Sequence, residues 1–157
     1  YAHKNTGRPL HEGKWFEKFR SNYLDVDNEP LYPFGYGLSY TTFNYGDITL
    51  DRTSIPMDGS LTAKVILTNT GNRDGAEVVQ LYIRDKVAES TRPVKELKGF
   101  QKVFLKAGES REITFKITPD LLKYYNYELQ YVAEPGAFDL MIGTDSQHVK
   151  TATFVLH

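Results

Sequence analysis

The sequence contains no cysteine, and among its 157 residues there are only 2 methionines and 1 tryptophan. Without cysteine there is no disulfide framework, no thiolate nucleophile and no zinc site built on cysteine ligands. The 4 histidines do not form the paired helical motif of a metalloprotease. They are His3, His11, His148 and His157. We therefore expect surface histidines, and we predict neither a metal site nor any other cofactor.

An excess of charge of one sign is also lacking. The 19 basic and 20 acidic residues give a net charge of −1. A nucleic-acid-binding domain needs a basic excess or a basic stripe, so we predict no nucleic-acid partner. No apolar stretch approaches the roughly 20 residues that a membrane-spanning helix requires, so we predict no membrane span. The glycine-rich motifs that bind phosphate are missing as well.

Aromatic residues are what the sequence does have in abundance, with 11 Tyr, 9 Phe and 1 Trp making up 13% of the chain. From about residue 45, aromatic and β-branched residues alternate with polar ones in short segments separated by turn formers. The predicted strands are residues 61–68, 79–84, 100–105, 113–117, 124–132, 138–142 and 148–156, and residues 118–122 are predicted to form a helical turn. The pattern predicts an all-β fold, an immunoglobulin-like antiparallel β-sandwich, with a closed barrel as the alternative.

Residues 1–44 differ in composition from the rest of the chain. They mix aromatic rings with Gly, Pro, Asn and Asp and keep neither a period of 2 nor one of 3.6. Such a segment cannot form its own core, so we expect its rings to be buried against another surface. We predict an irregular arm and linker at residues 1–44 and the β-sandwich at residues 45–157. Because the chain starts at Tyr1 rather than at a methionine, we expect a piece cut from a longer protein.

Carboxylates are the only candidates for catalysis, since no serine lies in a G-x-S-x-G motif. The densest group is Asp25, Asp27 and Glu29, and two carboxylates can hydrolyse a glycosidic bond. Nothing in the neighbouring sequence would raise the pKa of one carboxyl group while keeping the other ionised. A solvated acidic turn is therefore the preferred interpretation, and we predict no catalytic residue in this chain.

Exposed aromatic rings can also stack on sugars. The candidates for such a role are Trp15, Tyr127 and Tyr131, with Tyr124 and Tyr125 in the same tyrosine-rich segment. Tyr127 and Tyr131 would share one face of the predicted strand at residues 124–132. The alternative is that these rings are amphipathic residues of a core or an interface, each with its hydroxyl group in water.

Four stretches of the sequence together resemble one enzyme family. They are residues 32–43 (YPFGYGLSYTTF), 69–82 (NTGNRDGAEVVQLY), 92–100 (RPVKELKGF) and 134–143 (EPGAFDLMIG). In this order they resemble the C-terminal part of glycoside hydrolase family 3 enzymes, the β-glucosidases and β-xylosidases. Residues 5–9 (NTGRP) resemble the end of the α/β domain that precedes this part in the family.

The resemblance implies a fibronectin type III-like β-sandwich at residues 45–157 and a non-catalytic accessory role. The parent enzyme would be a retaining exo-glycosidase acting on terminal β-linked glucosyl or xylosyl residues. Both catalytic carboxylates would lie in upstream domains of the same polypeptide, which become the expected partner. The family also implies a periplasmic or secreted protein. Two alternatives stay open, a carbohydrate-binding module that contacts polymeric β-glucan or oligosaccharide, and a complete small hydrolase.

Overall fold

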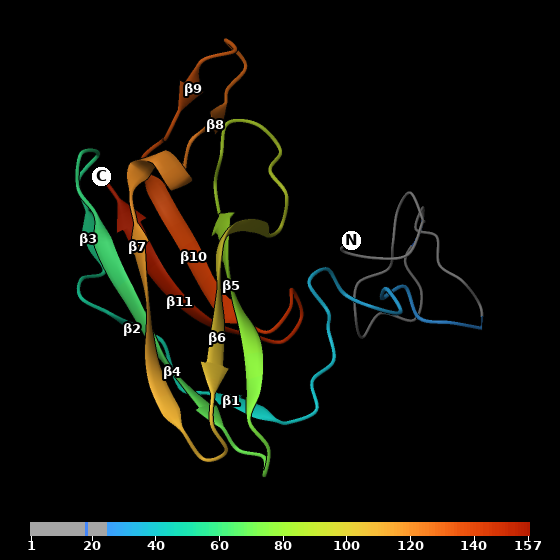
Figure 1. The fold of residues 1–157 in the computed structure, drawn as a ribbon. Coiled ribbons are helices and arrows are strands. Elements are labelled where there is room, and N and C mark those ends of the chain that lie inside the picture. The colour runs from blue at the N-terminus through green and yellow to red at the C-terminus, as the bar shows by residue number, and fades with distance from the viewer. Residues whose placement is uncertain (1–17, 19–24) are drawn as a thin grey trace.

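Two β-sheets pack face to face in the computed structural model, which describes Lys18 and residues 25–157 (Figure 1). The smaller sheet consists of β1 (Phe43–Tyr45), β2 (Thr49–Leu50), β4 (Leu61–Asn69) and β7 (Ser110–Ile117). The larger sheet has the order β3 (Ser54–Ile55), β11 (Val149–Leu156), β10 (Gly136–Gly143), β5 (Gly75–Asp85) and β6 (Glu96–Leu105). In the described part of the chain, no strand of the smaller sheet pairs with a strand of the larger one. The fold is therefore a sandwich and not a closed barrel. The predicted all-β, immunoglobulin-like class is confirmed.

The core lies between the two sheets and follows from the alternation in the sequence. On β4, the side chains of Leu61, Ala63, Val65 and Leu67 are buried, whereas the residues between them are not. The neighbouring strand β7 alternates in the same way, and its Phe115 pairs with Ala63. Period-2 alternation is what a strand with one wet face requires.

The central strands of the larger sheet do not alternate in this way. On β5, Val79, Leu81 and Ile83 point into the core, yet Gln80 and Tyr82 on the opposite face are buried as well. Something therefore covers the outer face of this sheet. The cover is the segment that leads into β1, and it forms the site described below.

One predicted strand is wrong. Residues 124–132 form a two-stranded hairpin of β8 (Tyr124–Tyr125) and β9 (Tyr131–Val132), with Tyr127 in the turn. The Oδ1 atom of Asn126 accepts hydrogen bonds from the backbone N–H groups of Glu128 (3.1 Å) and Gln130 (2.9 Å), which folds the chain back on itself. A turn that uses an asparagine and no glycine lacks the usual sequence signal.

Other local predictions agree with the structure. The expected helical turn at residues 118–122 contains the 3₁₀ helix η1 (Pro119–Leu121). The boundary placed between residues 44 and 45 stays a prediction, and β1 begins at Phe43. Among the described residues, no helix has the length and apolar character to cross a membrane.

Candidate functional site

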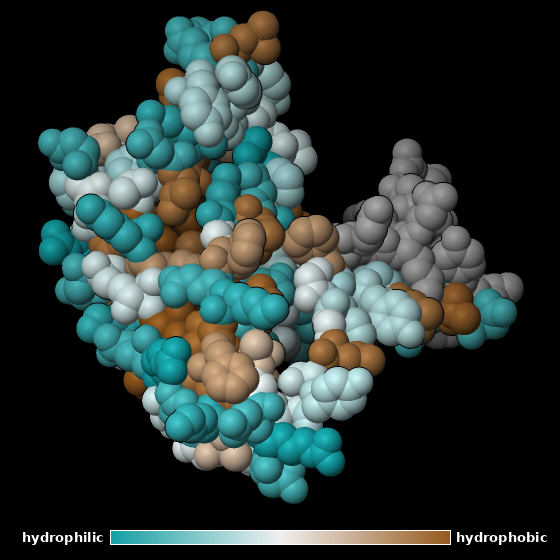
Figure 2. All heavy atoms as spheres, in the orientation of Figure 1, coloured by the Kyte–Doolittle hydropathy of each residue, from teal (hydrophilic) through white to brown (hydrophobic). Residues whose placement is uncertain are grey.

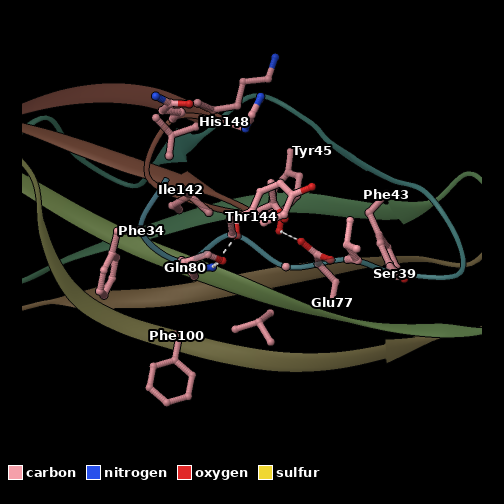
Figure 3. A pocket seen from close by; sticks show the side chains of 18 of the residues that line it. Phe34, Ser39, Phe43, Tyr45, Glu77, Gln80, Phe100, Ile142, Thr144 and His148 are labelled. Atoms are coloured by element: carbon pink, nitrogen blue, oxygen red, sulfur yellow. Dashed lines mark hydrogen bonds between the residues drawn. The ribbon is translucent and has the colours of Figure 1, made fainter. Parts of the chain in front are cut away.

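A segment around Phe34 and Gly35 is fixed to the outer face of the larger sheet by the side chain of Gln80. The Nε2 atom of Gln80 donates to the carbonyl oxygen of Gly35 (3.0 Å) and to that of Thr144 (Figure 3). The hydroxyl group of Tyr82 donates to Oε1 of Gln80 (2.5 Å). The buried amide of Gln80 is thus satisfied on both sides, as a buried polar group must be. Burial, followed by the charge of Asp145, raises the pKa of Tyr82 to about 12, so Tyr82 remains a donor at neutral pH.

Gly35 is the point of closest approach between this segment and the sheet. Its φ angle is +82°, a conformation that favours glycine. A Cβ atom at this position would lie 2.0 Å from Oε1 of Gln80. Both observations explain why the turn-rich sequence at residues 32–37 needs a glycine here.

The loop between β10 and β11 holds the other side of the segment. The N–H group of Ser146 donates to the carbonyl oxygen of Phe34 (2.9 Å). The buried carboxylate of Asp145 accepts from the N–H groups of Gln147 and His148, both at 2.8 Å, and its Oδ2 lies 2.8 Å from Nδ1 of His148. Burial raises the pKa of the Asp145 carboxyl, but the hydrogen bonds from His148 and Gln147 outweigh burial and hold the pKa below its ordinary value.

A second polar contact joins the two sheets near the same segment. The hydroxyl group of Tyr45 on β1 donates to Oε1 of Glu77 on β5 (2.9 Å), and both residues line the cavity drawn in Figure 3. Burial, with the adjacent Glu77 carboxylate, raises the pKa of Tyr45 well above its ordinary value. Glu77 is therefore the acceptor of a hydrogen bond that joins the two sheets.

A groove of about 940 Å³ runs between the segment and the outer face of the larger sheet. A second hollow of about 620 Å³ lies beside it and shares Phe34 and Leu97 in its lining. Six apolar residues line the first groove and expose their side chains, and together they are called the groove surface below. They are Phe34, Tyr36, Leu38, Val78, Leu97 and Phe100. Hydrophobic residues also gather over the middle of the sandwich and along the entering segment in Figure 2.

One carboxylate of the predicted acidic cluster contacts the loop between β10 and β11. Asp25, Asp27 and Glu29 lie at the surface, and Oε2 of Glu29 accepts from Nε2 of Gln147 (2.7 Å). In the part of the chain that the structure describes, no group of three or more His, Asp or Glu side chains could hold a metal ion. The arrangement can hold an apolar partner.

The other predicted residues lie elsewhere. Trp15, His3 and His11 fall outside the described residues. Tyr127 and Tyr131 are exposed on the β8–β9 hairpin, where the ring next to Tyr131 is that of Tyr125. Sequence reasoning missed Gln80, because a polar residue between apolar ones in an alternating strand is expected to face water. It also missed Glu77, which lies on the same face of β5 as Val79 and bonds Tyr45 of the other sheet. The signal that was available is the glycine-rich run at residues 35–37, which indicates a close backbone approach.

Comparisons with known proteins now identify the fold family. A family model described as "Fibronectin type III-like domain" matches residues 77–146. The chain is 51% identical over 156 residues to a periplasmic β-glucosidase of Salmonella typhimurium, covering 99% of this chain and 20% of that protein. It is 47% identical over 128 residues to a β-xylosidase of Formosa agariphila, covering 82% of this chain and 18% of that protein.

The solved structures agree. A β-glucosidase from Listeria innocua in complex with gluconolactone matches with a TM-score of 0.87 and 40% identity, over 99% of this chain and 22% of that one. The chain contains the fibronectin type III-like domain of glycoside hydrolase family 3. The resemblance of the four sequence stretches to this family is thereby confirmed. The chain spans about a fifth of the length of the curated relatives it matches.

The similarity to these relatives includes the segment that lines the groove. The model for the fibronectin type III-like domain starts at residue 77, whereas the Salmonella relative is similar over nearly the whole chain. The similarity therefore extends over the segment at residues 32–43, which crosses the outer face of the larger sheet. This segment and the sandwich are features of one and the same group of relatives.

Proposed function

We propose that the chain is a non-catalytic accessory part of a β-glucosidase-like exo-glycosidase, which stabilises the catalytic domains by packing against them. The parent enzyme would hydrolyse terminal β-linked glucosyl or xylosyl residues with retention of configuration. The proposal is supported by relatives that are named β-glucosidases and β-xylosidases and that are about five times as long as the chain. The catalytic carboxylates of the parent would lie in the part that this chain does not share.

The groove surface is the observation that carries the proposal. Leu38 and Phe100 are 88% and 66% exposed and line the same groove. Soluble monomeric proteins rarely expose a contiguous apolar area of more than a few hundred Å² unless it contacts a partner. Aromatic residues are enriched at protein interfaces, and Phe34, Tyr36 and Phe100 supply half of the groove surface.

The path of the chain favours a partner within the same polypeptide. Residues 31–38 run along the groove before they enter the sandwich, and the exposed rings of Tyr32 and Tyr36 lie 5.1 Å apart on this segment. A domain joined to the chain ahead of these residues is held beside the groove surface by a short tether. Such a tether raises the effective concentration of the partner, so a modest interface suffices.

The test compares Leu38→Ser and Phe100→Ser in the intact enzyme and in the isolated chain. Both side chains are largely exposed, so each substitution should leave the Tm of the isolated chain nearly unchanged. In the intact enzyme each should destabilise the packed assembly by about 1–3 kcal/mol, seen as a lower Tm of the catalytic part. The matched control is Tyr127→Ser, which removes an exposed ring outside the groove surface. An equal loss of Tm in the isolated chain and in the enzyme would contradict the proposal.

Two finer points belong to the same proposal. The purified chain should not hydrolyse a nitrophenyl β-glucoside, and turnover that is abolished by Asp27→Asn would favour the small-hydrolase alternative instead. The parent is proposed to act in the periplasm or outside the cell, on the support of the Salmonella relative that is named periplasmic. Fractionation of cells that express the full gene tests this location directly.

A further inference from the structure

The β8–β9 hairpin stands out from one end of the sandwich, away from both sheets (Figure 1). Tyr125 and Tyr131 are cross-strand partners on this hairpin and therefore lie on the same face. Their ring centroids are 5.0 Å apart with an angle of 44° between the planes. Both rings are more than half exposed, at 64% and 54%, so they form an open aromatic surface and not a small core.

The hairpin is fixed at its base and at its tip. At the base, Tyr124 is buried, the guanidinium group of Arg92 lies 4.7 Å from its ring centroid, and its hydroxyl accepts from the N–H group of Glu89 (3.1 Å). At the tip, the N–H group of Asn126 donates to the carbonyl oxygen of Gln130 (3.1 Å), in addition to the two bonds that its side chain accepts. The two exposed rings are thus held in place before any ligand arrives, which lowers the entropic cost of binding.

The surroundings of the two rings are polar. The side chains of Glu128 and Gln130 are exposed in the turn, and Lys123 pairs with Asp120 (2.6 Å) just before the first strand. Flat apolar rings beside groups that donate and accept hydrogen bonds suit a ligand with apolar faces and a hydroxylated edge. A β-linked pyranose has this form, because its axial C–H groups make two flat faces and its equatorial hydroxyl groups point outward.

We propose that Tyr125 and Tyr131 form a stacking platform for the pyranose rings of a β-linked oligosaccharide or β-glucan. At this spacing and tilt the two rings contact each other and present one bent aromatic surface, against which the flat face of a pyranose can lie. The platform is too small for a stable protein interface, which needs about 800 Å² per partner, whereas two aromatic side chains offer at most about 150–250 Å² each. It is also separate from the groove surface, so it does not depend on the proposed accessory role.

The experiment titrates the isotopically labelled full chain with cellohexaose, laminarihexaose and glucose, and follows the backbone amide resonances. We expect saturable shifts that centre on residues 123–132, with millimolar dissociation constants. Each hexasaccharide should bind more tightly than glucose, because a longer ligand also reaches the polar side chains beside the two rings. A further titration with laminarin shows whether the polymer binds more tightly than laminarihexaose, which has the same linkage.

Variants separate stacking from other contacts. Tyr125→Ala with Tyr131→Ala should weaken binding by about tenfold or more, as removal of stacked rings does elsewhere. Tyr125→Phe keeps the ring and should retain most of the affinity. The matched control is Tyr40→Ala, which removes a 95% exposed ring on the entering segment and should change nothing.

Three results would overturn the proposal. They are the absence of saturation up to about 10 mM hexasaccharide, shifts that map away from the hairpin, or unchanged affinity in the double variant. Because the mapping uses the wild-type chain, it remains decisive even if the double variant folds poorly. Self-association of the chain that is lost in the double variant would show a protein contact instead, and would equally contradict the sugar platform.

Discussion

The Nε2 atom of Gln80 lies 3.0 Å from the carbonyl oxygen of Gly35, which is 45 residues earlier in the chain. This hydrogen bond, with the longer one from the Tyr82 hydroxyl to the Phe34 carbonyl oxygen (3.4 Å), connects the segment that enters the domain to a central strand of the larger sheet. The groove surface exists because the entering segment is held at this point.

Replacing Gln80 with leucine should remove the anchor while keeping the size of the side chain. The substitution leaves the carbonyl groups of Gly35 and Thr144 without this donor, and leaves the Tyr82 hydroxyl only the longer contact to the Phe34 carbonyl oxygen (3.4 Å). Buried polar groups that lose their partners cost about 1–3 kcal/mol each, so we expect the free energy of unfolding to fall by about 2–4 kcal/mol. Urea unfolding of the isolated chain measures this loss. The control, Gln130→Leu on the exposed turn, should change it by less than about 0.5 kcal/mol, and equal effects of the two variants would contradict the assigned role.

A comparison of Gly35 with Gly108 separates two costs of adding a Cβ atom. One is the steric clash with Gln80, and the other is the strain of a positive φ angle. Both glycines have positive φ angles, +82° and +77°, but a Cβ atom at Gly108 would meet nothing within 4 Å, whereas at Gly35 it would meet Gln80 at 2.0 Å. Gly108→Ala should therefore cost only the conformational strain, about 1–2 kcal/mol. Gly35→Ala should cost that amount and about 1–3 kcal/mol more, measured as the difference between their unfolding free energies. Similar losses in both variants would show that the segment can shift away from Gln80 at little cost.

Asp145 should make the stability of the domain depend on pH in the acid range. Its pKa is lower in the folded chain than its ordinary value of 3.8, because the hydrogen bonds from His148 and Gln147 outweigh the effect of burial. A group whose pKa is lowered by folding stabilises the protein above the unfolded pKa and loses this contribution as the pH falls through the folded pKa. We therefore expect the stability difference between wild type and Asp145→Asn to be constant above about pH 5 and to shrink below about pH 4. Unfolding curves at a series of pH values check this, and a difference that grows toward low pH would show that the sign is wrong.

The sequence is sufficient to predict the parts of the fold in which each residue is placed by its immediate neighbours. The alternation of Leu61, Ala63, Val65 and Leu67 predicts β4 with its buried face, because period 2 is a local property of a strand. The same logic fails at Gln80, where an outward polar residue is buried by a segment 45 residues away. The sequence pattern around Gln80 does not indicate that a segment so far away in the chain covers this residue.

The hairpin at residues 124–132 escaped prediction for a different reason. A tight turn is usually announced by glycine or by an Asn-Gly pair, since these residues tolerate a positive φ angle. Here the positive angle is taken by Leu129, at +59°, and the turn is closed by the side chain of Asn126. The sequence indicates Tyr125, Tyr127 and Tyr131 as candidates for stacking, but the pairing of Tyr125 with Tyr131 exists only because the chain folds back.

Leu129 offers a last test of this turn, and one that leaves the two stacking rings unchanged. It is the one described residue other than glycine with a positive φ angle, and its side chain is 80% exposed, so packing does not compensate for the strain. Asparagine tolerates this conformation better than leucine and does not add the flexibility of glycine to the unfolded chain. Leu129→Asn should therefore raise the free energy of unfolding by about 0.5–1 kcal/mol, whereas Tyr127→Asn, two residues earlier and without a positive φ angle, should not. A loss of stability in Leu129→Asn would mean that the leucine side chain contributes to the hairpin in a way that its exposure does not indicate.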